Sequence, residues 1–322
     1  MREVDVAVIG AGPAGLFAAY YAGFRGLSVS VIDALPEPGG QVTAMYPEKL
    51  ILDVAGFPAI KGRELVTNLV AQAAPFHPDY RLGVRAEKLS YFDGRPVLGL
   101  AGGEQLTCGA VLVTGGLGSF TPRPLPVAES FTGGGIVYFV PQPTELTDRH
   151  VLIVGGGDSA FDWAATLAPL ARSVTLVHRR DRFRAHAATI ERVRALPVRI
   201  VVNAEVSRLY GEETVTGAEL TVRGGEVETL PVDTVVAALG FTADLGPLAE
   251  WGLNLDRRHI VVDSAMATNL PRVFAAGDIT EYPGKVRLIA TGFGEAATAV
   301  NNAAVVIDPS AHLFPGHSSD GT

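Results

Sequence analysis

Cysteine is almost absent from this chain of 322 residues, which contains a single one, Cys108. One thiol can form neither an intramolecular disulfide nor a Cys-x-x-Cys redox pair, and this scarcity fits a reducing cytoplasm. Cys108 lies in the apolar segment Leu106–Thr114, which has the character of a strand that runs into a glycine turn. We interpret the residue as part of the core, with a reactive thiol as the alternative.

Positive charge is also in short supply, because 26 lysines and arginines face 34 aspartates and glutamates and leave a net charge of −8. This balance argues against general affinity for nucleic acid or an anionic membrane, both of which require a cationic surface. Residues 6–24 carry no charge, which could indicate a signal peptide or a membrane span. However, Glu3 and Asp5 replace a basic leader, and glycines interrupt the run. We therefore expect a buried strand, turn and helix, with no targeting segment, membrane partner or metal site.

A strand, a glycine-rich turn, a helix and a second strand follow one another twice along the chain. The first copy spans residues 4–33 and the second spans residues 151–177. Their strands are short apolar runs of the kind that is buried in a parallel sheet. Each copy is a βαβ unit, so the sequence predicts two dinucleotide-binding folds.

The predicted fold class is α/β, with two Rossmann-like domains of the three-layer ββα type. A strand at 273–278 and an Ala-rich helix at 292–306 have no βαβ unit of their own, so we assign them to the first domain. The first domain then comprises residues 1–118 and 245–322, and the second, residues 119–244, is inserted into it. We expect the chain to cross between them at Pro122–Pro126 and after Gly240, because proline-dense segments suit hinges.

The first glycine turn has the spacing Gly10, Gly12, Gly15 between a strand and a helix. In that context the first glycine permits a tight turn, the second lets the backbone approach a pyrophosphate, and the third lets helix and strand pack closely. The helix N-terminus supplies unpaired N–H groups for the phosphates. Asp33 ends the following strand, where an acid binds ribose hydroxyls. A purely structural turn is the alternative interpretation.

The second turn reads Gly155, Gly157, Ala160, and its following strand ends in a basic segment, His178–Arg184, instead of an acid. Guanidinium groups can bind a 2′-phosphate in bidentate fashion, whereas a carboxylate would repel it. The sequence therefore predicts NADP(H) in preference to NAD(H), with a solvated basic helix start as the alternative. The three side chains that we expect to bind the 2′-phosphate are Arg179, Arg180 and Arg184.

A third acid, Asp278, follows a strand of small residues. We interpret it as an acceptor for the polyol chain of a bound cofactor, with an N-cap for the following segment as the alternative.

Five motifs, in order along nearly the whole chain, resemble the thioredoxin reductase superfamily. They are Gly10–Gly15, Pro38–Gln41, Gly155–Ala160, His178–Asp181 and Ala275–Asp278. Thioredoxin reductases carry a Cys-x-x-Cys shortly before the second glycine turn, whereas this chain has Tyr138–Pro143 there, without sulfur. Thioredoxin reduction through a dithiol is therefore excluded.

Further segments resemble the thioredoxin-reductase-like ferredoxin–NADP⁺ reductases within that superfamily. They are Tyr46–Lys49, Asp53–Pro58, Tyr138–Pro141, Gly157–Trp163 and the tail Pro315–Asp320. The resemblance implies a homodimer with FAD and NADP(H) as cofactors. It also implies hydride transfer from NADPH to flavin N5, followed by one-electron steps to ferredoxin or flavodoxin.

The resemblance also assigns roles to individual residues. Tyr46 and His317 would cover the flavin ring, the histidine reaching it from a C-terminal tail, and Ser319 would lie near flavin N5. The alternatives are ordinary packing for Tyr46 and a terminus without fixed structure for His317. The full set of expected FAD contacts is Gly10, Gly12, Pro13, Ala14, Asp33, Gly40, Gln41, Tyr46, Ala86, Phe120, Asp278 and Ile279. The expected NADPH contacts are Gly155, Gly157, Asp158, Ser159, Ala160, His178, Arg179, Arg180 and Arg184.

Three other functions remain open from the sequence. A bacillithiol-type disulfide reductase would be expected to carry cysteine in the first glycine turn, where this chain has Ala14. A diaphorase or quinone reductase would share every cofactor contact and differ only in its acceptor. A flavin-bearing redox sensor or scaffold would bind the cofactors without turnover.

Overall fold

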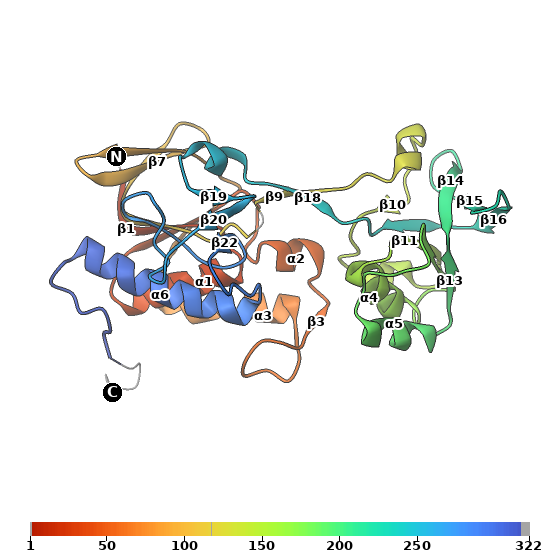
Figure 1. The fold of residues 1–322 in the computed structure, drawn as a ribbon, viewed down its shortest axis with the longest axis horizontal. Helices are drawn as coiled ribbons and strands as arrows, with labels where there is room; N and C mark the ends of the chain where they lie inside the picture. The colour runs from red at the N-terminus through yellow and green to blue at the C-terminus, as the bar shows by residue number, and fades with distance from the viewer. Residues whose placement is uncertain (1, 117, 317–322) are drawn as a thin grey trace. The chain divides into compact units, whose positions relative to one another are not determined.

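The structure is a computed structural model that describes residues 2–116 and 118–316. It divides into two compact units (Figure 1). The first unit contains the residues up to Ser119 and those from Ala243 onward, and the second unit is Phe120–Thr242.

The chain passes between the units in two strands that pair with each other, β9 (Ser119–Pro122) and β18 (Phe241–Asp244). The proline-rich segment 122–126, which the sequence suggested as a crossing, begins as β9 ends and leads into a 3-10 helix at Pro126–Ser130. Paired strands thus make the crossing, and Pro126 starts the short helix, where its missing N–H is not needed.

The first unit is built on a seven-stranded sheet with the order β5-β2-β1-β8-β7-β6, in which β21 also pairs with β8. β1 is parallel to β2 and β8, whereas β7 is antiparallel to β6 and β8. The strands are β1 (Arg2–Ile9), β2 (Val29–Asp33), β5 (Asp79–Leu82), β6 (Ala86–Phe92), β7 (Arg95–Leu100), β8 (Gln105–Val113) and β21 (Val273–Ala275).

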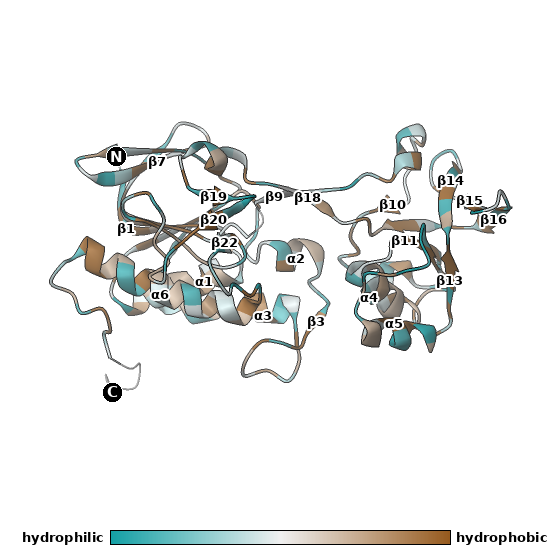
Figure 2. Ribbon diagram, in the orientation of Figure 1, coloured by the Kyte–Doolittle hydropathy of each residue, from teal (hydrophilic) through white to brown (hydrophobic). Residues whose placement is uncertain are grey.

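The helices α1 (Pro13–Phe24), α3 (Gly62–Ala73) and α6 (Ile289–Ile307) lie side by side in this unit (Figure 1). Figure 2 shows apolar and polar residues alternating along α6, as expected for a helix with one buried side. Alanines line the buried side of both α1 and α6, which lets the two helices pack closely. The smaller elements are α2 (Gln41–Met45), β3 (Leu50–Ile51), β4 (Ile60–Lys61), β19 (Leu255–Asp256), β20 (His259–Val261) and β22 (Thr280–Glu281).

Helix α6 begins at Ile289, earlier than the start at Gly292 that the sequence suggested. Gly292 lies inside the first turn of α6, where the absence of a side chain allows the helix to pack closely against neighbouring segments. A Cβ there would lie 3.3 Å from Gly277 Cα and 3.4 Å from Ala14 Cβ. The glycine therefore marks a close contact rather than a helix end.

The second unit has a parallel sheet with the order β10-β17-β11-β12-β13. Val151 and Ile153 of β11 pack against α4, whereas Leu152 and Val154 of the same strand belong to the cluster formed with the small sheet β14-β15-β16. This alternation is the three-layer ββα arrangement that the sequence predicted. The elements are β10 (Ile136–Val137), β11 (His150–Val154), α4 (Asp158–Leu167), β12 (Ser173–His178), α5 (Ala187–Arg194), β13 (Val198–Val202), β14 (Ala204–Tyr210), β15 (Gly217–Val222), β16 (Val227–Pro231) and β17 (Thr234–Ala237).

Cys108 lies in β8 with no exposed surface, so the interpretation as a core residue is confirmed. Burial raises the pKa of its thiol to about 12. None of the helices in residues 2–116 and 118–316 is long and apolar enough to cross a membrane.

Candidate cofactor sites

Two glycines of the first turn are required by the fold itself. Gly10 has a φ of +110°, and a Cβ there would lie 2.6 Å from the Thr114 carbonyl oxygen. A Cβ on Gly15 would overlap the Gly10 carbonyl oxygen. Neither position can accept a side chain without moving backbone.

Within the described part of the chain, neither the backbone conformation nor a close contact requires glycine at position 12. It is the N-cap of α1 with φ −70° and ψ 178°, a conformation open to any residue, and a Cβ there would meet nothing within 4 Å. The space lies next to the free N–H groups at the start of α1, and Pro13, at the first helical position, has no N–H to leave unpaired. Open space at a helix N-terminus fits the approach of a phosphate.

The second turn repeats this difference between its glycines. A Cβ on Gly155 would overlap the Ala238 carbonyl oxygen, whereas a Cβ on Gly157 would have none of the described residues within 4 Å apart from its chain neighbours. Ala160, fully buried on α4, packs 3.1 Å from the position of a Cβ on Gly155. Gly12 in the first turn and Gly157 in the second thus face open space among the described residues, so both turns fit a pyrophosphate.

Asp33 stands at the end of β2 beside the first turn. Its carboxylate accepts hydrogen bonds from Ala11 N–H at 2.6 Å and Leu35 N–H at 2.8 Å. Burial raises the pKa of Asp33, and the two backbone donors oppose this shift. The two bonds fix the carboxylate at the position where a ribose hydroxyl is expected.

Three further loops of the first unit converge on this turn. Gly40, which precedes α2, approaches Gly12, since a Cβ on Gly40 would lie 3.2 Å from Gly12 Cα. Gln41 Nε2 lies 3.0 Å from the position of a Cβ on Gly116, in the loop after β8. A Cβ on Gly277 would lie 3.2 Å from Ala14 Cβ. The structure thus brings segments that are far apart in the sequence to one end of the sheet.

Tyr46 follows α2 and lies close enough to Asp278 to be affected by its charge. Burial, together with the negative charges of Asp278 and Asp53, raises the pKa of Tyr46 to about 12. The pKa of Asp278 is raised by burial, which the cations of Lys285 and Arg287 partly offset. Tyr46 is thus an uncharged, half-buried ring at neutral pH, next to a desolvated carboxylate.

The remaining predicted residues of the first site lie in different settings. Ala86 is buried at the start of β6, Ile279 is fully buried behind Asp278, and Phe120 belongs to the crossing strand β9. His317 and Ser319 lie outside the described residues. Before them, the tail is held by Arg25 at the end of α1, whose guanidinium donates to the carbonyl oxygens of His312 at 2.7 Å and Leu313 at 2.9 Å.

The basic loop of the second unit is bound to its glycine turn. Arg184 N–H donates to the Gly156 carbonyl oxygen at 2.7 Å, and the Asp158 carboxylate accepts from His186 N–H at 2.9 Å. The Phe183 ring packs edge-on against Phe161, with centroids 4.8 Å apart. The sequence did not reveal the Asp158 contact, because it joins the first residue of α4 to the residue that precedes α5.

The three arginines are exposed, and in the part of the chain that the structure describes none of their side chains has an ion-pair partner. They are Arg179, Arg180 and Arg184. His178 packs its ring against Gly156, and burial lowers its pKa, so it carries no charge near neutral pH. The positive charge at this strand end comes from the arginines, while Ser159 is exposed in the first turn of α4. The arrangement fits a 2′-phosphate.

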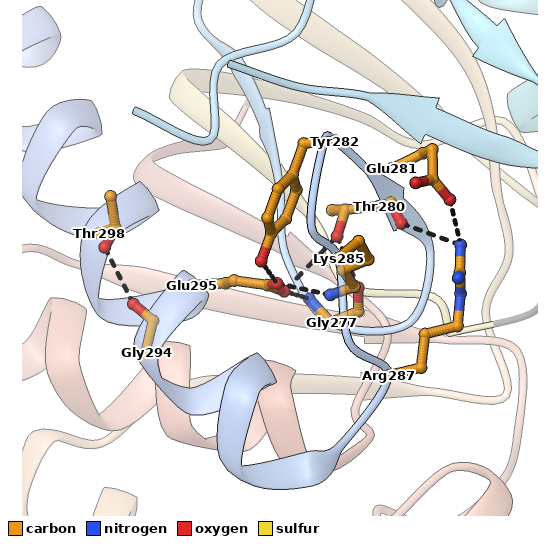
Figure 3. A network of polar contacts seen from close by, with 9 residues as sticks. All are labelled: Gly277, Thr280, Glu281, Tyr282, Lys285, Arg287, Gly294, Glu295 and Thr298. Carbon is orange, nitrogen blue, oxygen red and sulfur yellow. Dashed lines mark hydrogen bonds and ion pairs between the residues drawn. The ribbon is translucent and has the colours of Figure 1, made fainter. Parts of the chain in front are cut away.

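Sequence reasoning missed a buried ion pair beside Asp278 (Figure 3). Lys285 Nζ lies 2.5 Å from Glu295 Oε1, with side chains that are 1% and 4% exposed. The one sign of it in the sequence was a single glutamate within the Ala-rich helix. Neither hydrophobic periodicity nor composition shows that this glutamate pairs with a lysine.

Comparison with known proteins places this fold in a family. Residues 4–303 match the family described as pyridine nucleotide-disulphide oxidoreductase. The chain belongs to this family. Two proteins called ferredoxin–NADP reductase, from Salinispora arenicola and Salinispora tropica, are 87% and 84% identical to it over 322 residues, which is 100% of each chain. The crystal structure of T. acidophilum thioredoxin reductase has a TM-score of 0.79 and 28% identity, covering 94% of this chain and 98% of its own.

These matches confirm the resemblance to the thioredoxin-reductase-like ferredoxin–NADP⁺ reductases of the pyridine nucleotide-disulphide oxidoreductase family. They also make the chain an oxidoreductase. With Cys108 alone and buried in β8, the chain lacks the dithiol that a disulfide relay requires.

Proposed function

We propose that the chain is a ferredoxin–NADP⁺ reductase that uses FAD to carry electrons between NADPH and ferredoxin or flavodoxin. Relatives with that name match the chain over its full length. The observation that carries the cofactor part of the proposal is the open space at Gly12 and Gly157, where, apart from chain neighbours, no described residue comes within 4 Å of a Cβ. Two such spaces, one in each unit, support two dinucleotides rather than one.

The first unit would bind FAD and the second NADPH, with domain boundaries at residues 118–119 and 244–245. The first glycine turn would receive the FAD pyrophosphate, Asp33 the ribose, and Asp278 the ribityl chain. Gly40 and Gln41 would border the same site, with Ala86 on the adenine side. The second turn would receive the NADPH pyrophosphate, and the arginine cluster would bind the 2′-phosphate.

Bound FAD supplies the conversion between two-electron hydride chemistry and one-electron transfer, which side chains cannot perform. The protein's part is to orient the two cofactors and to select the nucleotide. Tyr46 offers a flat ring that stays uncharged, because its pKa is about 12. It can therefore stack on an aromatic ring without adding charge. His317 and Ser319 would complete the site from the tail, His317 as a cover that moves aside for the nicotinamide.

We further propose a cytoplasmic homodimer in which the two units rotate relative to one another during turnover. Size-exclusion chromatography with light scattering tests the dimer. Hydride transfer that is unchanged in a protein cross-linked across β9 and β18 would argue against the rotation.

The acceptor is tested with purified enzyme, NADPH and a panel of ferredoxin, flavodoxin, a quinone and thioredoxin, followed anaerobically by flavin absorbance. We expect rapid flavin reduction by NADPH and reoxidation by ferredoxin or flavodoxin. Reoxidation by the quinone alone would support a diaphorase, and a flavin that NADPH does not reduce would support a sensor. Turnover with thioredoxin would overturn the proposal.

A further inference from the structure

The ion pair of Lys285 and Glu295 is part of a polar network in the interior of the first unit (Figure 3). Glu295 extends from α6, and Lys285 comes from the loop that joins β22 to α6. Tyr282 donates its hydroxyl hydrogen to Glu295 Oε1 at 2.5 Å, and Lys285 Nζ lies 5.5 Å from the centre of the Tyr282 ring. The pair is thus enclosed by its own loop and helix.

The network binds both backbone polar groups of Gly277. Glu295 Oε2 accepts from Gly277 N–H at 2.8 Å, and Lys285 Nζ donates to the Gly277 carbonyl oxygen at 3.0 Å. Thr280 donates to the same carbonyl oxygen at 2.8 Å. Gly277 has a φ of +83° and no side chain, and its carbonyl oxygen also accepts a turn hydrogen bond from Thr280 N–H at 3.1 Å. Glu295 thus holds the peptide before Gly277, and Lys285 together with Thr280 holds the carbonyl oxygen of the peptide between Gly277 and Asp278.

A buried ion pair is an expensive way to stabilise a fold. Removing both charges from water costs several kcal/mol per ion, and apolar replacements of similar volume are often neutral or stabilising. A neighbouring pair joins Arg287 of the same loop to Glu281 of β22. Its side chains are 35% and 30% exposed, and among the described residues it makes no hydrogen bond with Gly277. The buried pair differs from this exposed pair because it forms hydrogen bonds with the backbone of Gly277.

We infer that Lys285 and Glu295 are positioning residues, which fix the peptide before Asp278 so that its carboxylate is presented to FAD. The inference rests on the proposed role of Asp278 in binding FAD. On this inference the pair serves to raise the affinity for FAD rather than the stability of the fold, because both side chains form hydrogen bonds with Gly277, the residue before Asp278.

The test uses full-length holoprotein and a set of matched variants. K285M/E295Q removes both charges and the bond to the Gly277 carbonyl oxygen, and D278N removes the carboxylate. The control, R95M/E3Q, makes the same charge change in an exposed ion pair of the first unit, Arg95 and Glu3. FAD affinity is measured from the fluorescence of flavin released on dilution, and thermal unfolding of the FAD-free proteins checks the fold.

We expect the K285M/E295Q variant to bind FAD about tenfold more weakly, since it leaves Asp278 misoriented, and the control to stay within about twofold. D278N added to K285M/E295Q should cause no loss beyond that of D278N alone, because residues that act through one group are not additive. If the losses multiply, or if K285M/E295Q binds FAD normally, the inference is wrong. A wild-type protein that binds no FAD would instead refute the proposed function. Should the double variant fail to fold, K285R, which keeps the charge but changes the reach, is expected to weaken FAD binding severalfold, and unchanged binding would overturn the inference.

Discussion

Replacing Gly12 with alanine separates the needs of the fold from the needs of the cofactor. Apart from its chain neighbours, no described residue has an atom within 4 Å of the added methyl group, and the backbone there, with φ −70° and ψ 178°, suits alanine. In the absence of FAD the change is expected to alter the free energy of unfolding by less than about 1 kcal/mol, because the gain from a stiffer unfolded chain and the loss at an N-cap are both small. The corresponding shift in Tm is at most about 3 °C.

With FAD the same methyl group would occupy the space that a pyrophosphate needs. The phosphate would be pushed away from the N–H groups at the start of α1. Hydrogen bonds to charged groups contribute about 1.5–3 kcal/mol each. Losing one or two of them weakens FAD binding by roughly 10- to 10,000-fold.

Gly15→Ala is the matched control, because its Cβ would overlap the Gly10 carbonyl oxygen. That variant should lose stability even without FAD. The assay combines thermal unfolding of FAD-free protein with the dissociation constant for FAD. Normal FAD affinity in Gly12→Ala would refute the assignment of the space to a phosphate. A large loss of stability in the FAD-free Gly12→Ala protein would refute the claim that the fold does not need this glycine.

Four further outcomes are expected. Changing Arg179 and Arg180 to alanine should raise the KM for NADPH at least tenfold with NADH kinetics unchanged, and equal losses for both nucleotides would refute a 2′-phosphate contact. Asp278→Asn should stabilise the FAD-free protein at neutral pH, because burial raises the pKa of Asp278 above its ordinary 3.8 and stability falls as pH rises through that raised pKa. Its gain in Tm should shrink toward zero as pH falls to the ordinary value, and a gain that is constant with pH would contradict this cause. Cys108 should be inert to a thiol reagent until the protein unfolds, since its pKa is about 12 and it is buried. Truncation after Phe314 should change the stopped-flow rate of hydride transfer, and an unchanged rate would contradict a covering role for the tail.

The fold class could be predicted because local signals agreed with the global arrangement. Gly10 and Gly15 mark turns where only glycine fits, and the apolar runs beside them form β1 and β2. Gly292 misled the sequence analysis, because a glycine that permits close packing and a glycine that ends a helix look alike in a sequence. Only the structure shows that it lies against Gly277.

The candidate sites were predictable where the spacing within one motif implies its geometry, and not where a contact joins a helix residue to a separate segment. The spacing of the second turn identified Gly157, yet no motif indicates the hydrogen bond that His186 N–H donates to the Asp158 carboxylate. In the same way, Lys285 and Glu295 meet only because the loop before α6 folds back on the helix. The roles of His317 and Ser319 stay predictions.

The paired strands β9 and β18 have a consequence for protein engineering. The chain leaves and re-enters the first unit at nearly the same point, since a Cβ on Gly118 would overlap the Asp244 carbonyl oxygen. Residues 120–242 can therefore be treated as a cassette. A short Gly-rich linker should close the gap and give a self-contained remainder, and a homologous cassette with a different strand-end charge should be graftable without redesigning the host.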